Sequence, residues 1–358
     1  VVEGINFYDS GNIQDSYIIF NLAFNLCPNN STVLLWKSKA ELLLGKLDQA
    51  ISDLKLVLAV SNDPAETANA ELSLALALYF YSFFTTGAEK DGVLSQVYSY
   101  ASHAEEHFTR LNDQYSRNLS TWLKIMVSIE SNDIDRAIDL LKSELLHLLH
   151  GTAMSYLDLR TSHYSSALSH INIVLADLQH SNDLRPPLRD LLRDFLHLMK
   201  ARTLSEGYGK HEEALAILNS ISRTNVVHYL ALLYAAQIYE RVGQILEACN
   251  ACSEIIQNFD SPLVREMIRR LNCSLHGLRI VHVIKNSITT PSSPNYVSVS
   301  RSLALTSSLN WNPKVWIGKT LSVYKVEELV GEGGNGYVLR ATAPNMEEVA
   351  IKVLKIRY

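Results

Sequence analysis

The sequence predicts a mostly α-helical protein: a solenoid of helix–turn–helix repeats, followed by a short antiparallel β meander. Three observations lead to this prediction. A short motif that begins with glycine recurs 34 residues apart, a Ser/Thr/Pro-rich stretch follows the helical pattern, and strand-like segments flank a glycine-rich loop near the end. We therefore expect a helical repeat domain over residues 1–285, a linker over 286–313 and a β segment over 314–358.

Two pairs of segments show the period of 34 residues. Gly11–Ser16 recurs as Gly45–Ala50, and Gly209–Ala214 recurs as Gly243–Ala248. Glycine suits a tight turn between two helices because it adopts positive φ without a steric penalty. Looser copies of the motif lie between these pairs. The small residue five positions after the start of each turn, expected where two helices approach closely, is Ser16, Ala50, Ala137, Ala167, Ala214 or Ala248.

This period resembles that of tetratricopeptide repeats (TPRs). The resemblance is loose over Glu66–Ser116, where another type of α-solenoid remains an alternative. It implies a concave face that binds protein or peptide partners. In chaperone-binding members of the family, lysine and asparagine on the first helix of a repeat hold a carboxylate. The corresponding positions here are Leu35 and Lys39, and Leu233 and Gln237, which speaks against a receptor for chaperone tails.

The helical pattern is expected to end in a capping helix over Pro262–Lys285. Asn286–Ser308 then combines low hydrophobicity with many serines, threonines and prolines. Such a composition is typical of a linker or a disordered segment. Its serines are also candidates for regulatory phosphorylation, although most serine-rich linkers serve only as linkers.

Two motifs stand in the last part of the sequence. Gly331–Val338 fits G-x-G-x-x-G-x-V, and Val349–Lys352 reads V-A-I-K. In a dinucleotide-binding fold, a helix would follow the glycine loop at once. Here strand-forming residues lie on both sides of the loop, beginning at Tyr324–Val330. The order strand, glycine loop, strand, turn, strand predicts an antiparallel meander.

Together the two motifs resemble the start of a Hanks-type Ser/Thr protein kinase domain, from Trp316 to Tyr358. The resemblance implies a glycine flap over the phosphates of ATP, an apolar ceiling over its adenine, and a lysine, Lys352, that pairs with the α- and β-phosphates. The alternative is a purely structural meander with a solvated lysine, which the apolar surroundings of that lysine disfavour. The implied ATP-binding residues are Val330, Gly331, Glu332, Gly333, Gly334, Asn335, Gly336, Tyr337, Val338, Ala350 and Lys352.

The H-R-D and D-F-G motifs of the kinase family do not occur in this sequence. No catalytic residue and no Mg²⁺ ligand of the family pattern is therefore present, and we expect no phosphoryl transfer by this chain alone. Two functions stay open. The chain is either part of an ATP- and Mg²⁺-dependent kinase of protein substrates with a TPR-like regulatory region, or a TPR-type peptide-binding scaffold with a vestigial or pseudokinase remnant. The sequence after Tyr358 would discriminate between them.

The composition favours a soluble, cytoplasmic protein. Its 358 residues carry a net charge of −5, and no basic stretch is interleaved with aromatic residues, so we expect no nucleic-acid partner. No apolar run is long enough to span a membrane. The four cysteines form no recognisable disulfide framework. Neither His103 with His107 nor Cys249 with Cys252 predicts a metal site: a solvated helix face and small buried contact residues explain these pairs better.

Overall fold

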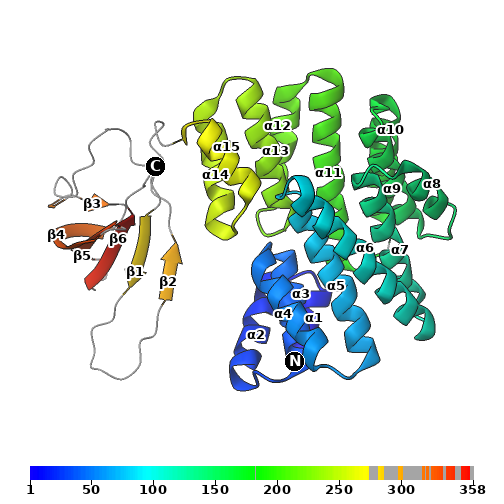
Figure 1. Ribbon diagram of the computed structural model, residues 1–358, viewed down its shortest axis with the longest axis horizontal. Coiled ribbons are helices and arrows are strands. Elements are labelled where there is room, and N and C mark those ends of the chain that lie inside the picture. Colours follow the sequence, from blue (N-terminus) through cyan, green and yellow to red (C-terminus); the bar gives the residue numbers. More distant parts are fainter. Residues whose placement is uncertain are drawn as a thin grey trace. The chain divides into compact units, whose positions relative to one another are not determined.

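The computed structural model describes residues 1–181, 183–273, 281–285, 297–300, 317–318, 320–321, 324–333, 336–342 and 348–354. The chain divides into two compact units (Figure 1). The first comprises Val1–Gln244 and Glu254–Glu266, and the second comprises Ile245–Ser253 and Met267–Tyr358.

The described part of the chain contains fifteen α-helices, and none of them is both long and apolar enough to cross a membrane. They are α1 (Val2–Asp9), α2 (Ile13–Leu26), α3 (Ser31–Leu43), α4 (Leu47–Val60), α5 (Pro64–Ser82), α6 (Gly87–Arg110), α7 (Gln114–Glu130), α8 (Ile134–Leu141), α9 (His147–Arg160), α10 (Tyr164–His180), α11 (Pro186–Tyr208), α12 (His211–Ser220), α13 (Val227–Arg241), α14 (Ile245–Asn258) and α15 (Pro262–Arg270).

The turns between paired helices have the predicted geometry. Gly11, Gly45, Gly209 and Gly243 adopt φ values of 86°, 75°, 65° and 79°. Several helices then begin at a side-chain cap: for example, the Asp63 carboxylate accepts hydrogen bonds from the first-turn amides of α5. The predicted small contact residues are all fully buried: Ser16, Ala50, Ala137, Ala167, Ala214 and Ala248. These features confirm a TPR-like succession of helix–turn–helix repeats.

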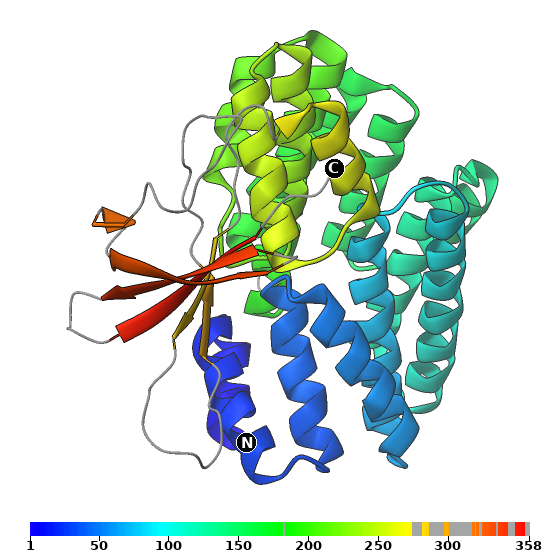
Figure 2. The same cartoon turned by 60° about the vertical axis from the view of Figure 1, so that its left-hand side comes forward.

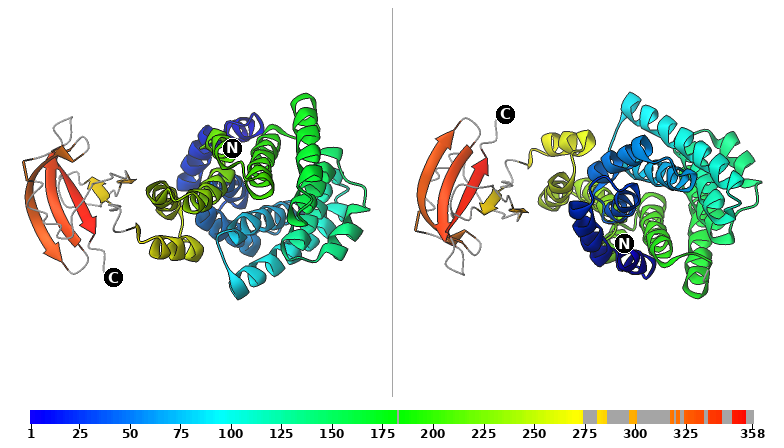
Figure 3. Two further views of the ribbon diagram at one scale, coloured as in Figure 1. Left: turned by 90° about the horizontal axis from the view of Figure 1, so that it is seen from above. Right: turned by 90° about the horizontal axis from the view of Figure 1, so that it is seen from below.

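In the first unit, the odd-numbered helices α3 to α13 pack against one another in series, and each even-numbered helix up to α12 packs beside its odd-numbered partner. The series curves so far that its first helix, α1, contacts α11. Figure 3 shows the blue α1–α4 beside the green α11–α13. The odd-numbered helices therefore line the inner, concave side of a tightly wound solenoid.

Specific contacts close this curve. The Val226 amide donates a hydrogen bond of 2.8 Å to the Leu43 carbonyl. Gly45 allows the close approach, because a Cβ there would lie 2.3 Å from the Tyr229 ring. Farther along, the rings of Phe84 and Phe259 meet edge to face, with their centroids 4.4 Å apart. Residues nearly two hundred positions apart thus stabilise one another.

The second unit contains a six-stranded antiparallel sheet with the order β2-β1-β6-β5-β4-β3. Figure 2 shows β4, β5 and β6 side by side, in orange to red. The predicted meander, β4–β6, is confirmed as one part of this larger sheet. Its strands are β1 (Val281–Lys285), β2 (Val297–Ser300), β3 (Thr320–Leu321), β4 (Tyr324–Gly333), β5 (Gly336–Thr342) and β6 (Glu348–Leu354).

Three predictions about the region before the meander are wrong. The capping helix ends at Arg270, and Val281–Lys285 is a strand that pairs with β6. Val297–Ser300, expected within a linker, is a strand that pairs with β1. A disulfide joins Cys249 to Cys273, where the sequence suggested no disulfide. Strand pairing and disulfide pairing both depend on partners distant in sequence, which a local composition pattern does not contain.

Candidate functional site

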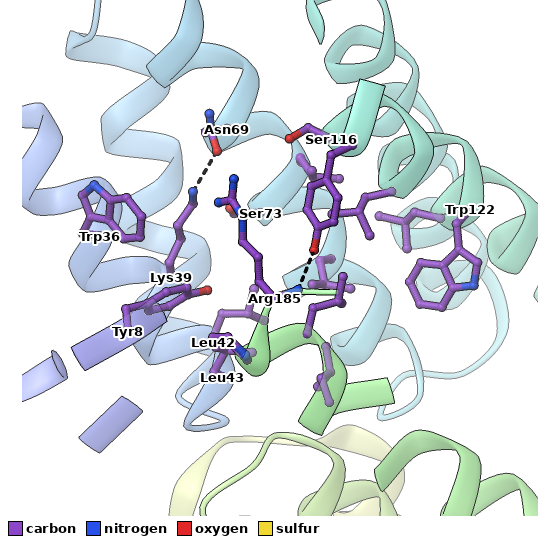
Figure 4. A pocket seen from close by; sticks show the side chains of 18 residues that line it. Tyr8, Trp36, Lys39, Leu42, Leu43, Asn69, Ser73, Ser116, Trp122 and Arg185 are labelled. Carbon is purple, nitrogen blue, oxygen red and sulfur yellow. Dashed lines mark hydrogen bonds between the residues drawn. The ribbon is translucent and has the colours of Figure 1, made fainter. Parts of the chain in front are cut away.

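A pocket with a cavity volume of about 130 Å³ opens on the concave side of the first unit (Figure 4). Helices α1, α3, α5, α7 and α11 supply its walls. Much of the wall is apolar, and four of its leucines stay partly exposed: Leu72, Leu76, Leu119 and Leu188. The indole N–H of Trp122, which also lines the pocket, is buried without a hydrogen-bond partner among the described residues.

Lys39 of α3 is the half-buried cation of this pocket. Its ammonium group donates a hydrogen bond of 2.8 Å to Asn69 Oδ1 on α5 and lies 4.7 Å from the ring centroid of Trp36. It forms no ion pair with any described carboxylate. Burial, together with the positive charge of Arg185, lowers the pKa of Lys39 to about 8.

Arg185 precedes α11 and supplies the second cation. Pro186 begins the helix, and a residue before proline is driven to extended backbone, as φ of −60° and ψ of 145° show. This conformation lets the exposed Arg185 leave the helix axis toward the pocket. Its guanidinium group lies 5.2 Å from the ring centroid of Tyr115, and its backbone N–H donates to the Tyr115 hydroxyl at 3.4 Å. Figure 4 shows the side chains of Lys39 and Arg185 extending into the same space.

Hydroxyl groups complete the polar part of the pocket. Tyr8 of α1 packs edge to face on Trp36, with a centroid separation of 5.3 Å. Burial raises the pKa of Tyr8, and burial likewise raises that of Tyr115, so both phenols stay protonated and able to donate. Ser73 of α5 presents another hydroxyl. Two cations, several hydroxyl donors and aromatic walls suit the binding of an anionic group attached to an apolar chain.

The structure places most of the predicted ATP-binding residues on three adjacent strands. Gly331, Glu332 and Gly333 end β4, Gly336, Tyr337 and Val338 begin β5, and Ala350 and Lys352 lie on β6. The register pairs Gly333 with Gly336, and Val338 with Lys352. Val330 has a side chain that is 60% exposed. Gly334 and Asn335 lie outside the described residues.

Of the two cations, the sequence indicates only Lys39, at a clamp position, and gives no sign that Arg185 lies near it. The sequence places Lys39 with Leu35 at the positions of a carboxylate clamp, whereas in the pocket Lys39 bonds to Asn69 and is repelled by the charge of Arg185. The available signal for Arg185 was local: a residue directly before Pro186 favours extended backbone, and proline is frequent at the first position of a helix. No local pattern indicated that this helix start faces α3.

His103 and His107 are not a fully solvated face, contrary to expectation. The half-buried His107 places Nδ1 3.0 Å from Oε2 of Glu71 on α5, and His103 Nδ1 lies 3.9 Å from Oε1 of the same carboxylate. Burial raises the pKa of Glu71, and the two histidines oppose that shift. No described group of three or more histidine, cysteine, aspartate or glutamate residues could hold a metal ion.

Comparison with known proteins gives short or distant likenesses. No protein-family model matches the chain. A segment of 47 residues is 40% identical to the serine/threonine-protein kinase ArnS of Sulfolobus acidocaldarius, and this match covers 13% of the chain and 7% of that kinase.

Among solved structures, a tetratricopeptide repeat protein from Parabacteroides merdae matches with a TM-score of 0.42 and 11% identity, over 75% of this chain and 96% of that one. The Cut9–Hcn1 hetero-tetramer of the APC/C gives 0.46 and 14%, over 75% and 48%. Yeast Tom70 gives 0.37 and 12%, over 74% and 60%. Likenesses of this size carry no argument about partners.

Proposed function

We propose that the helical unit is a protein-interaction scaffold that binds an extended segment of a partner along its concave side. The observation that carries this proposal is the pocket, which combines partly exposed leucines with two cations that pair with no described carboxylate. A half-buried cation without a counter-charge destabilises a folded protein, so such a group is typical of a binding site rather than of a structural core. The concave surface of a solenoid is also where such proteins usually bind peptides.

Photo-crosslinking tests the scaffold function. A photoreactive amino acid replaces Leu119 inside the pocket in one variant and Leu22, 57% exposed on α2, in a matched control. Peptides selected from a random phage-displayed library on the unmodified chain serve as probes. We expect these peptides to crosslink at position 119 and not at position 22. Equal crosslinking at both positions, or a failure to select any peptide, would contradict the proposal.

We also propose that β4–β6 form the nucleotide-binding start of a Ser/Thr protein kinase domain. A match of 47 residues, 40% identical, to a kinase of that class supports this, as do the antiparallel order of the strands and the pairing of Val338 with Lys352. ATP would supply the transferred phosphoryl group and Mg²⁺ would neutralise its charge. From this chain, the backbone amides of Gly331, Gly333 and Gly336 and the ammonium of Lys352 would hold the phosphates.

The test of the kinase function is ATP titration of the full-length protein. Lys352→Met removes a charge-assisted contact to phosphate, which is worth about 1.5–3 kcal/mol, and we expect at least a tenfold loss of affinity. Lys325→Met, which removes an exposed charge from β4, is the control and leaves affinity unchanged. Equal affinity of the wild type and Lys352→Met would refute this role of the lysine.

A further inference from the structure

The concave pocket contains positive charge that the protein itself does not neutralise. Lys37, Lys90 and Lys124, on α3, α6 and α7, each lie within 2.6 Å of a carboxylate oxygen. Lys39 and Arg185 have no such partner among the described residues, although they are close enough for each to repel the other. Of the acids near Lys39, Asp9 and Asp113 act only through their field and form no ion pair with it. Direct contact with a described carboxylate therefore neutralises neither cation of the pocket.

The donors around these cations face the same space. Asn69 orients the Lys39 ammonium through its amide oxygen. The Tyr115 hydroxyl accepts from the Arg185 backbone, so its own proton is left to donate. Tyr8 and Ser73 donate no hydrogen bond to any described residue, and both line the pocket. A ligand with several acceptor oxygens on one atom would satisfy cations and hydroxyls together.

We infer that the pocket binds a phosphorylated serine or threonine side chain of a peptide partner. This inference rests on the proposed scaffold function. A phosphomonoester carries about −1.5 to −2 charges at pH 7 and three acceptor oxygens, which match the two cations and the hydroxyls. A glutamate or a chain terminus carries a single negative charge and leaves one cation without a partner. The leucines around the cations accommodate apolar residues next to the phosphorylated one.

The charge balance predicts a bell-shaped dependence of binding on pH. Affinity rises as the phosphate loses its second proton, near pH 6. It falls again as Lys39 loses its proton, with a pKa of about 8 in the free protein. The charged groups that act on Lys39 are Arg185, Asp9 and Asp113. The phenols of Tyr8 and Tyr115 line the same pocket and do not titrate in this window. In Lys39→Met, affinity still rises as the phosphate loses its second proton (the lower limb of the profile). It no longer falls near pH 8 (the upper limb).

The experiment measures fluorescence anisotropy on the full chain. The probes are three labelled libraries of nine-residue peptides, degenerate except for a central phosphoserine, serine or glutamate. We expect the phosphoserine library to bind at least tenfold more tightly than the serine library. Lys39→Met and Arg185→Met each weaken it at least tenfold. Lys200→Met, which removes a charge bonded to Asn172 on the neighbouring α10, changes it by less than twofold. Circular dichroism verifies that all variants keep their helices.

The outcomes separate this inference from the scaffold function. If the glutamate library binds as tightly as the phosphoserine library, the phosphate assignment is overturned and the scaffold function stands. If phosphopeptides bind equally to wild type, Lys39→Met and Arg185→Met, the pocket is not their site and the inference fails. If inorganic phosphate binds but no peptide library does, both proposals fail. Loss of the upper limb of the pH profile in Lys39→Met alone supports direct contact between this ammonium and the ligand.

Discussion

Two lysines on α3 show how differently this protein uses the same side chain. Lys37 and Lys39 stand two residues apart, about 200° around the helix, so they face opposite sides. Lys37 turns toward α4, and its ammonium lies 2.6 Å from Glu41 Oε1 on α3 itself and 2.6 Å from Asp53 Oδ2 on α4. Lys39 turns inward, to Asn69 and Trp36, without a carboxylate partner.

The two environments shift the lysine pKa values in opposite directions. Burial lowers the pKa of Lys37, but its hydrogen bonds to Asp53 and Glu41 outweigh burial and raise the value overall. Burial lowers the pKa of Lys39 to about 8, and no ion pair compensates. Lys37 therefore stabilises a repeat, whereas Lys39 destabilises the unliganded fold and keeps its charge available to a ligand.

Lys37→Met has the largest expected effect on stability. It leaves Glu41, whose side chain is 1% exposed, and Asp53 without their cation. Removing one partner of a buried ion pair typically destabilises a protein by about 3–5 kcal/mol. Urea denaturation followed by circular dichroism measures this loss. The double variant Lys37→Met/Glu41→Met recovers part of it, because no charge then stays fully buried alone; a loss below about 1 kcal/mol in the single variant would show that Lys37 is not structural.

The sequence was informative where the signal is local. A glycine five residues before a small residue predicted Gly45 at positive φ and Ala50 in a helix contact, and both follow from the sterics of one turn. The function of Lys39 could not be predicted in this way. Its environment depends on Arg185, which reaches the pocket only because the solenoid curves until α1 meets α11. The β1–β6 pairing and the Cys249–Cys273 disulfide were missed for the same reason: each joins distant segments.

Lys39→Met should have the opposite effect to Lys37→Met. At neutral pH, the fold must keep a charge that burial disfavours, and each unit of pKa shift corresponds to about 1.4 kcal/mol. After allowance for the lost contacts with Trp36 and Asn69, we expect a gain in the free energy of unfolding of about 1–2 kcal/mol. Urea denaturation at pH 7 measures it. Destabilisation by more than about 1 kcal/mol would place Lys39 with Lys37 as a structural group.

The pH dependence of stability tests the charge of Lys39 without changing the size of its side chain. The pKa of Lys39 is about 8 in the folded chain and has its ordinary value of 10.5 when unfolded. Between these values the unfolded chain binds more protons, so the free energy of unfolding rises with pH across this window. We therefore expect the advantage of Lys39→Met over the wild type to be full below pH 8 and to shrink toward pH 10. Parallel denaturation series of both proteins test this, and an advantage that is constant over the window would contradict the lowered pKa.

The smallest effect is expected at an ion pair that is exposed to solvent and for which no ligand is proposed. Arg110 Nη2 lies 3.1 Å from Glu106 Oε1, one turn apart on α6, and the side chains are 66% and 64% exposed. Water screens such a pair, and ordering two long side chains offsets most of its attraction. Arg110→Ala should therefore lower the free energy of unfolding by no more than about 0.5 kcal/mol, measured as for Lys37→Met. If Arg110→Ala instead lowers the free energy of unfolding as much as Lys37→Met, the distance between the charges, rather than their burial, decides what an ion pair contributes in this solenoid. The difference between Lys37 and Lys39 would then need another explanation.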